Sequence, residues 1–167
     1  MNSKHSQSSM NEGGSKAGAA RGSEESVAQI TERELQLVAA KNRTEFLVNP
    51  RSLLEFYDRE SIQYFDLNVP LLEGEAYAEM LDRVAPEFIG KAAIHKLRVE
   101  ASGDVGVAWL FETYTGYARE NRQPLDLTFR ITHGWKRKAG VWLLVHEHYS
   151  YPVDAKTGLA QFSFPVT

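Results

Sequence analysis

The stretch that decides the fold is residues 135–152, Trp-Lys-Arg-Lys-Ala-Gly-Val-Trp-Leu-Leu-Val-His-Glu-His-Tyr-Ser-Tyr-Pro. Lys138-Ala139-Gly140 is a turn between two runs rich in apolar and aromatic side chains, so the stretch predicts a β-hairpin. We expect its strands over residues 125–137 and 141–151. Two long strands joined by a tight turn are typical of an antiparallel sheet.

Further strands are expected before this hairpin. Ser102-Gly103-Asp104 is a turn between expected strands at residues 94–101 and 105–117, and residues 118–124 form a polar loop. A short strand is expected at residues 62–68, and residues 159–164 are a candidate for one further piece.

The N-terminal half predicts helices. An apolar stripe predicts the first helix, and a capping box is expected inside it at Thr31 and Glu34 if the helix restarts there; the stripe consists of Val27, Ile30, Leu35, Val38 and Phe46. Asn49-Pro50 predicts the start of a short helix over residues 52–57, and a third helix is expected over residues 75–85. Helices followed by consecutive long hairpins predict an α+β fold with an antiparallel sheet.

Composition bounds the class of protein. The 167 residues carry a net charge of −3 and no cysteine, which argues against nucleic-acid binding and against thiolate chemistry. The chain has no apolar leader and no run of about 20 apolar residues, so no membrane association and a cytoplasmic location are expected. We expect a disordered tail at residues 1–25, one domain at 26–155 and a C-terminal extension at 156–167.

Two expected strands are apolar on both faces. In the last strand Trp142 and Leu144 alternate with Leu143 and Val145. An antiparallel sheet with one face in water shows a cleaner alternation than this. Because helices can cover only the concave face, the sequence predicts a homodimer through the outer face.

The hairpin resembles the C-terminal hairpin of SnoaL-like domains. It has an Arg130-x-Thr132 strand, a Gly140-x-Trp142 turn and a strand that ends in a His-x-His-x-Ser pattern at residues 146–150. Residues 53–57, 62–66 and 72–74 resemble the usual short helix, first strand and entry to the third helix of these domains, so the resemblance covers about residues 27–152.

This resemblance implies the cystatin-like, nuclear-transport-factor-2-like fold, also found in ketosteroid isomerases. In that fold a curved antiparallel sheet wraps around N-terminal helices as a cone-shaped roll, with a pocket for a small organic molecule. The fold hosts isomerases, dehydratases, cyclases, epoxide hydrolases, kinase association hubs and non-catalytic transport factors, so the function must come from the site.

Asp66 is the first candidate for chemistry. It ends the short strand Tyr64-Phe65-Asp66-Leu67, where the ketosteroid isomerases that this fold resembles carry their general base. The alternative is an ordinary Asp that accepts a hydrogen bond from a loop amide. Thr132 aligns with the oxyanion-binding Asp of those enzymes, and a Thr hydroxyl is a weaker donor, so ketosteroid isomerisation itself is not expected.

Glu147 and Tyr149 share a strand face with Val145, and the resemblance points this face into the pocket. It also points Arg130 and Thr132 inward. A buried Glu147 needs a partner, and Arg130 on the neighbouring strand is the expected one. Alternatively, Arg130 binds a ligand carboxylate, as pocket arginines do in the kinase association hubs that this fold resembles.

His146 and His148 lie on one strand face. With Gly140 they match the start of a cupin metal motif, but Pro152 and Val153 stand where that motif needs its Glu. No metal or cofactor is therefore expected. The histidines are expected in the core or an interface, with His148 as a candidate acid or base at the pocket rim.

Two functions remain open. The first is an isomerase, cyclase or dehydratase that transfers a proton on an apolar carbonyl compound. Its expected catalytic residues are Asp66, Tyr149, His148 and Glu147, and its expected substrate-binding residues are Arg130, Thr132, Trp109 and Tyr64. The second is a non-catalytic module for oligomerisation or for binding a small carboxylate.

Overall fold

The computed structural model describes residues 26–46, 50–67 and 71–166. The predicted tail at 1–25 and Asn49 of the predicted helix start lie outside these residues. The elements follow in the order α1 (Val27–Phe46), η1 (Pro50–Glu55), β1 (Gln63–Phe65), β2 (Leu72–Glu73), α2 (Glu75–Val84), η2 (Ala85–Glu87), β3 (Phe88–Ser102), β4 (Val105–Ala118), β5 (Pro124–Lys138) and β6 (Val141–Ser150).

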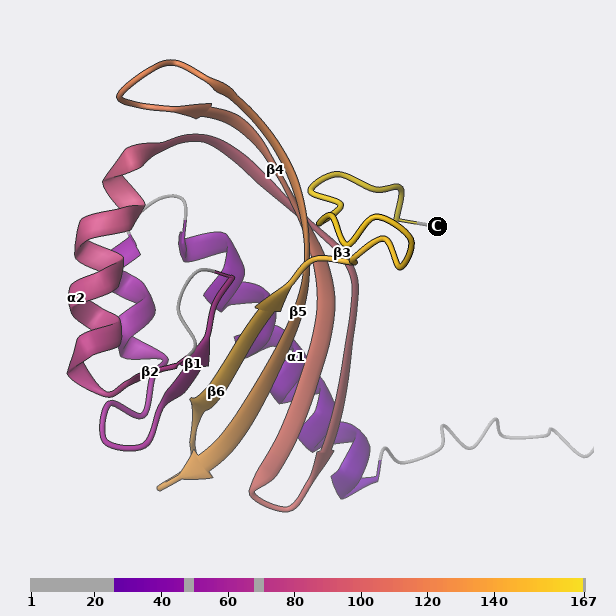
Figure 1. The fold of residues 1–167 in the computed structure, drawn as a ribbon. Coiled ribbons are helices and arrows are strands. Elements are labelled where there is room, and N and C mark those ends of the chain that lie inside the picture. The colour runs from indigo at the N-terminus through magenta and orange to yellow at the C-terminus, as the bar shows by residue number, and fades with distance from the viewer. Residues whose placement is uncertain (1–25, 47–49, 68–70, 167) are drawn as a thin grey trace, which may run out of the picture.

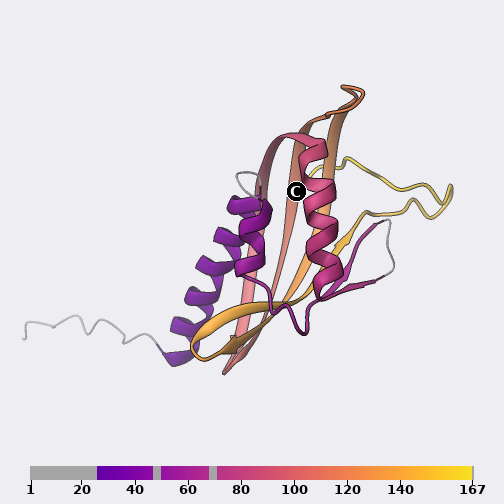
Figure 2. The same cartoon turned by 90° about the vertical axis from the view of Figure 1, so that its left-hand side faces the viewer.

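The strands form one curved sheet in the order β2-β1-β6-β5-β4-β3. β1 runs parallel to β6, and the other neighbouring pairs are antiparallel. Figures 1 and 2 show both α-helices on the concave side of the sheet. The predicted α+β roll, with a curved sheet around N-terminal helices, is confirmed.

α1 begins one turn earlier than the predicted capping box. The Ser26 hydroxyl accepts a hydrogen bond from the Gln29 amide at 3.3 Å, and the Gln29 side chain accepts one from the Ser26 amide at 2.9 Å. The helix does not restart at Thr31, whose hydroxyl donates to the Val27 carbonyl. The Thr31–Glu34 box is therefore wrong.

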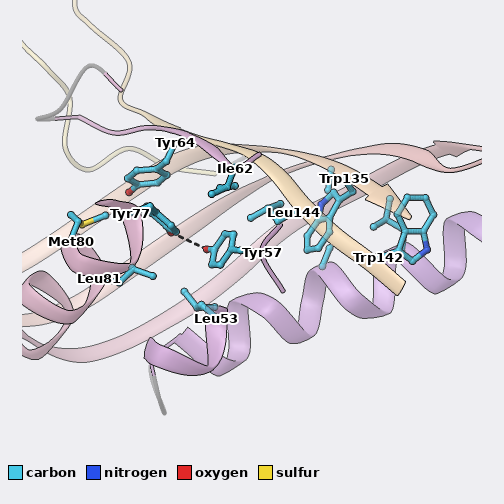
Figure 3. Packing of buried hydrophobic residues seen from close by; sticks show 13 residues of the cluster. Leu53, Tyr57, Ile62, Tyr64, Tyr77, Met80, Leu81, Trp135, Trp142 and Leu144 are labelled. Carbon is cyan, nitrogen blue, oxygen red and sulfur yellow. Dashed lines mark hydrogen bonds between the residues drawn. The ribbon is translucent and has the colours of Figure 1, made fainter. Parts of the chain in front are cut away.

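The buried face of α1 also differs from the predicted stripe. Leu35, Ala39 and Asn42 are fully buried, whereas Val27 at the start of the helix is 81% exposed. The helix therefore packs on the sheet through a face that begins after its first turn and runs from Thr31 to Arg43. The core continues through the tyrosines, leucines and tryptophans shown in Figure 3.

A β-bulge in the hairpin of β5 and β6 changes which side chains of β6 face inward. Gly134 pairs with His146 but Trp135 pairs with Leu144, so the register skips Val145. An extra residue shifts the alternation of a strand by one position. Trp142 and Leu144 before the bulge and Glu147 after it are therefore all buried against the helices.

The chain continues past β6 as an irregular segment over residues 151–166. It folds back on itself through a bridge between Val153 and Ala160. The Phe162 carbonyl then accepts a hydrogen bond from the Thr128 amide at 2.7 Å, beyond the point where β6 leaves β5. No strand forms at residues 159–164 within the described chain, so the predicted strand piece is wrong.

Candidate functional site

The interior of the roll contains a fully buried carboxylate, Glu147, with five surrounding donors. Its Oε1 accepts from Arg43 at 3.2 Å, from Tyr149 at 3.2 Å and from His133 at 3.0 Å. Its Oε2 accepts from the hydroxyls of Tyr57 at 3.0 Å and Tyr77 at 2.7 Å, and these two hydroxyls lie 2.8 Å apart (Figure 3). We call these five donors with Glu147 and Glu112 the inner cluster.

Arg43 projects from the buried face of α1, four residues after Ala39. Its Nε and Nη2 donate to both oxygens of Glu112 on β4, at 2.8 and 3.1 Å, while Nη1 reaches Glu147. The guanidinium therefore bridges two carboxylates, and both ends of each ion pair are nearly inaccessible to water. This geometry matches the demand that a buried charge be paired and hydrogen-bonded.

The donors determine the charge state of Glu147. Burial by itself raises the pKa of this carboxyl, but the interactions with His133, the charge of Arg43 and the hydrogen bond from Tyr77 lower the pKa to about 2. Glu147 is therefore ionised at neutral pH. Because a carboxylate only accepts hydrogen bonds, Nε2 of His133 carries the proton in their contact.

A second carboxyl that bears on function is that of Asp66. Asp66 follows β1 directly and is half-buried, and its Oδ1 accepts a hydrogen bond from the Leu67 amide at 2.6 Å. Burial is the main reason that the pKa of Asp66 is raised, and the hydrogen bonds from Leu67 and Tyr64 only partly offset it. Asp66 thus accepts a hydrogen bond from a loop amide, as an ordinary Asp would, and it also has the raised pKa expected of a general base.

An apolar hollow of about 430 Å³ lies beside the residue that follows Asp66. Its lining includes Leu67, the next residue in the chain, and Tyr151. The pKa of Tyr151 rises to about 12, mainly through burial and partly through the charge of Asp66. Other residues that line the hollow are Leu127, Tyr149, Val153 and Phe162. Its volume lies within the range of small-molecule sites and its lining is mainly apolar, but the hollow is open to solvent rather than enclosed.

The structure brings together some of the predicted site residues. Tyr64 and Asp66 lie two residues apart on the inner side of β1, and the Tyr64 ring packs edge-on against Tyr149 at 5.8 Å. Tyr149 connects the two regions, because its hydroxyl donates to Glu147 while its side chain lines the hollow. Glu147 and Tyr149 both face the interior of the roll, although Glu147 does not line the hollow.

Other predicted placements are wrong. Arg130 and Thr132 are exposed on the outer face of β5, since the buried residues there are Ile131 and His133. Arg130 donates to the Tyr151 carbonyl at 2.7 Å, and Arg43 takes its predicted place beside Glu147.

Trp109 and His148 also belong to the outer face. Trp109 pairs with Thr132, which pairs in turn with His148. The His148 ring lies beside Phe65 rather than beside Asp66, at 5.9 Å between centroids. These residues therefore do not line the hollow.

Sequence reasoning missed Arg43, Glu112 and His133. The signal for Arg43 was its position eight residues after Leu35, two helical turns along the same face. Glu112 alternates with Leu110 and Tyr114, and His133 alternates with Ile131 and Trp135. In each case a titratable residue occupied a position that the periodicity assigned to the core.

Two searches of the described ranges gave negative results. Within residues 26–46, 50–67 and 71–166, no group of three or more His, Asp or Glu side chains is arranged to hold a metal ion. No helix in that part of the chain is long and apolar enough to cross a membrane.

Known proteins resemble this chain in sequence or in structure. Residues 77–154 match the family model of the SnoaL-like domain. No curated protein matches the chain by sequence. A nuclear-transport-factor-2-like (NTF2-like) protein of unknown function from Pseudomonas putida KT2440 is similar in structure with a TM-score of 0.68 and 25% identity, covering 82% of this chain and 97% of that chain.

Two more distant structures share the fold. A candidate dehydratase of the NTF2-like family from Streptomyces avermitilis has a TM-score of 0.62 and 14% identity, covering 72% of this chain and 96% of that chain. The association domain of C. elegans CaMKII has a TM-score of 0.54 and 17% identity, covering 72% and 98%. The predicted resemblance to SnoaL-like and NTF2-like proteins is confirmed, by the family model over residues 77–154 and by the fold over most of the chain.

Proposed function

We propose that this protein binds an apolar carbonyl compound in the hollow and that Asp66 transfers a proton on it. The observation that carries the proposal is a half-buried carboxyl with a raised pKa beside an apolar, aromatic-lined space. A carboxylate whose pKa is raised towards neutrality is a better general base than one that is fully solvated. The candidate dehydratase among the similar structures is consistent with this class of reaction.

The chemistry needs no group beyond the chain. The Asp66 carboxylate removes a proton from the carbon next to the carbonyl, and the C–H bonding electrons move to form an enolate. The nearby hydroxyl of Tyr151, which lines the hollow, donates a hydrogen bond to the enolate oxygen. Protonated Asp66 then returns the proton to the same or another carbon, which regenerates the carboxylate.

Glu147 and His148 have other roles in this proposal. Glu147 is fully buried and accepts five hydrogen bonds, so it positions Tyr149 rather than contacting substrate. His148 lies on the outer face and takes no part in the proton transfer. The catalytic set is therefore reduced to Asp66 and Tyr151.

Deuterium exchange tests the base without knowledge of the natural substrate. The wild-type protein should exchange the α-hydrogens of 1-tetralone in D2O faster than buffer alone, as followed by NMR. Asp66→Asn should reduce the rate to that of buffer, because an amide cannot accept the proton. Glu73→Gln removes an exposed carboxylate from β2, next to β1, and should leave the rate unchanged. Exchange that persists in Asp66→Asn would exclude Asp66 as the base.

The second candidate function is a non-catalytic oligomerisation module. It is favoured by the similarity to a CaMKII association domain and by the apolar side chains of Trp109 and Phe111 on the outer face of β4. The carboxylate-binding version is not retained, because Arg43 already bridges Glu112 and Glu147, and Arg130 is exposed outside the roll.

The predicted homodimer through the outer face is compatible with both candidates, so a dimer alone does not separate them. Light scattering at micromolar concentration should give a dimer for the wild type and a monomer for Trp109→Glu. Leu37→Glu, at an exposed site on α1, should stay dimeric. A larger closed oligomer without deuterium exchange would favour the module. The predicted cytoplasmic location stays a proposal, which cell fractionation tests.

A further inference from the structure

The C-terminal segment, residues 151–166, forms one wall of the hollow. Val153, Ala160 and Phe162 contribute to the lining. The SnoaL-like family model ends at residue 154, so Ala160 and Phe162 belong to a part of the chain beyond that match. Val153 of this wall therefore lies within the matched range, and Ala160 and Phe162 lie after it.

Hydrogen bonds fix the position of Phe162 relative to the sheet. Its carbonyl accepts from the Thr128 amide on β5 at 2.7 Å, and the preceding Gln161 amide donates to the Pro152 carbonyl at 2.8 Å. On the other side, the Ser163 hydroxyl donates to Asp126 at 3.2 Å. Anchors before, at and after Phe162 hold the ring at a defined place beside the hollow.

Aromatic rings converge at this place. The Phe162 ring meets Tyr151 edge-on, with centroids 4.9 Å apart and an interplanar angle of 80°. Tyr151 packs against Phe129 at 5.2 Å, and Phe129 packs edge-on against Tyr149 at 5.6 Å. Phe162 remains 55% exposed, so much of its ring is still open to a further partner.

We propose that Phe162 is a specificity-determining residue that selects ligands with a flat aromatic ring over saturated ligands of the same skeleton. The inference rests on the proposed function, because it assigns a substrate class to the same hollow. An aromatic ligand can pack edge-on or offset against Phe162 and Tyr151, and such pairs add to the burial of area. A puckered saturated ring gains the burial but not the ring–ring geometry.

A matched pair of ketones tests this selection. Calorimetry should give the wild-type protein a roughly fivefold tighter Kd for 1-tetralone than for its saturated counterpart 1-decalone, the size expected for one aromatic pair. Phe162→Leu keeps an apolar side chain without the ring, so the ratio should fall towards one through weaker binding of 1-tetralone. Leu159→Ala changes an exposed residue of the same segment that does not line the hollow, and should keep the wild-type ratio.

The outcomes separate the two proposals. If the wild-type protein binds neither ketone, the proposed function falls and the role of Phe162 falls with it. If it binds both and Phe162→Leu keeps the wild-type ratio, the role of Phe162 is overturned while Asp66 stays a candidate base. Equal melting temperatures of the variants show that neither result comes from unfolding.

Discussion

Two carboxyl groups on the neighbouring parallel strands β6 and β1 behave in opposite ways. Glu147 pairs with Tyr64, and Asp66 follows the last paired residue of β1, so the two groups belong to the same side of the sheet. Glu147 is the more deeply buried, yet its pKa falls to about 2, whereas the pKa of half-buried Asp66 rises.

The difference teaches that the surrounding donors, rather than the depth of burial, decide the direction of the pKa shift here. Glu147 accepts from five side chains, one of them a guanidinium. Asp66 accepts from a backbone amide and one tyrosine and lies beside apolar surface. Desolvation therefore dominates at Asp66, and hydrogen bonding with charge pairing dominates at Glu147.

The largest expected effect comes from removing the cation of the inner cluster. Arg43→Met leaves Glu112 and Glu147 buried without their shared partner, and should lower the free energy of unfolding by roughly 3–5 kcal/mol. Urea denaturation measures the loss. Lys41→Met, on an exposed position of the same helix, should change stability by less than about 0.5 kcal/mol. Similar values for both variants would contradict the proposed importance of the buried pairing.

Acid should reveal the contribution of Glu147. Its folded pKa of about 2 lies below the ordinary value of 4.5, so its stabilisation is fully present above pH 4.5 and is lost as the pH falls towards 2. The linkage amounts to roughly 3 kcal/mol at neutral pH. Urea denaturation of the wild type between pH 7 and pH 2 should show the free energy of unfolding decreasing by this amount as the pH falls. Glu147→Gln should be less stable at neutral pH, and its free energy of unfolding should lack the part of the pH dependence that comes from Glu147.

The smallest effect on stability, and the opposite direction, is expected for Asp66. Its folded pKa is raised, so ionisation is less favourable in the folded protein, and stability from this group increases as the pH falls through that pKa. Asp66→Asn should therefore melt at the wild-type temperature or above it at pH 7, as measured by calorimetry. A melting temperature well below wild type would show that the Leu67 amide contact matters more for the fold than the cost of burying the charge.

Local sequence patterns were enough to predict most of the fold. Turn residues located the hairpins, and the observed Lys138–Val141 turn has Ala139 and Gly140 at φ of 49° and 81°, as a tight hairpin requires. The helix formed by residues 75–84 was bracketed by Gly74 and Pro86. These signals depend on a few neighbouring residues, which is why the sequence alone reveals them.

The site was harder to predict, because its geometry depends on register. Strict alternation grouped Glu147 with Val145, but the bulge at Val145 places Glu147 on the face of Leu144 instead. Arg130 and Thr132 were oriented by resemblance, and their outward direction follows from the observed burial of Ile131 and His133. The partner of Glu147 came from a helix 104 residues away, a contact that no local pattern encodes.

The arrangement of the inner cluster also bears on how the chain folds. The partners of Glu147 that lie outside β6 come from α1, the residues after η1, α2 and β5, with sequence separations of 104, 90, 70 and 14 residues. A partly folded chain that buries β6 before either helix docks leaves a desolvated carboxylate without its donors. Such intermediates are penalised, so the cluster should favour an all-or-none transition in which helices and sheet acquire their native packing together.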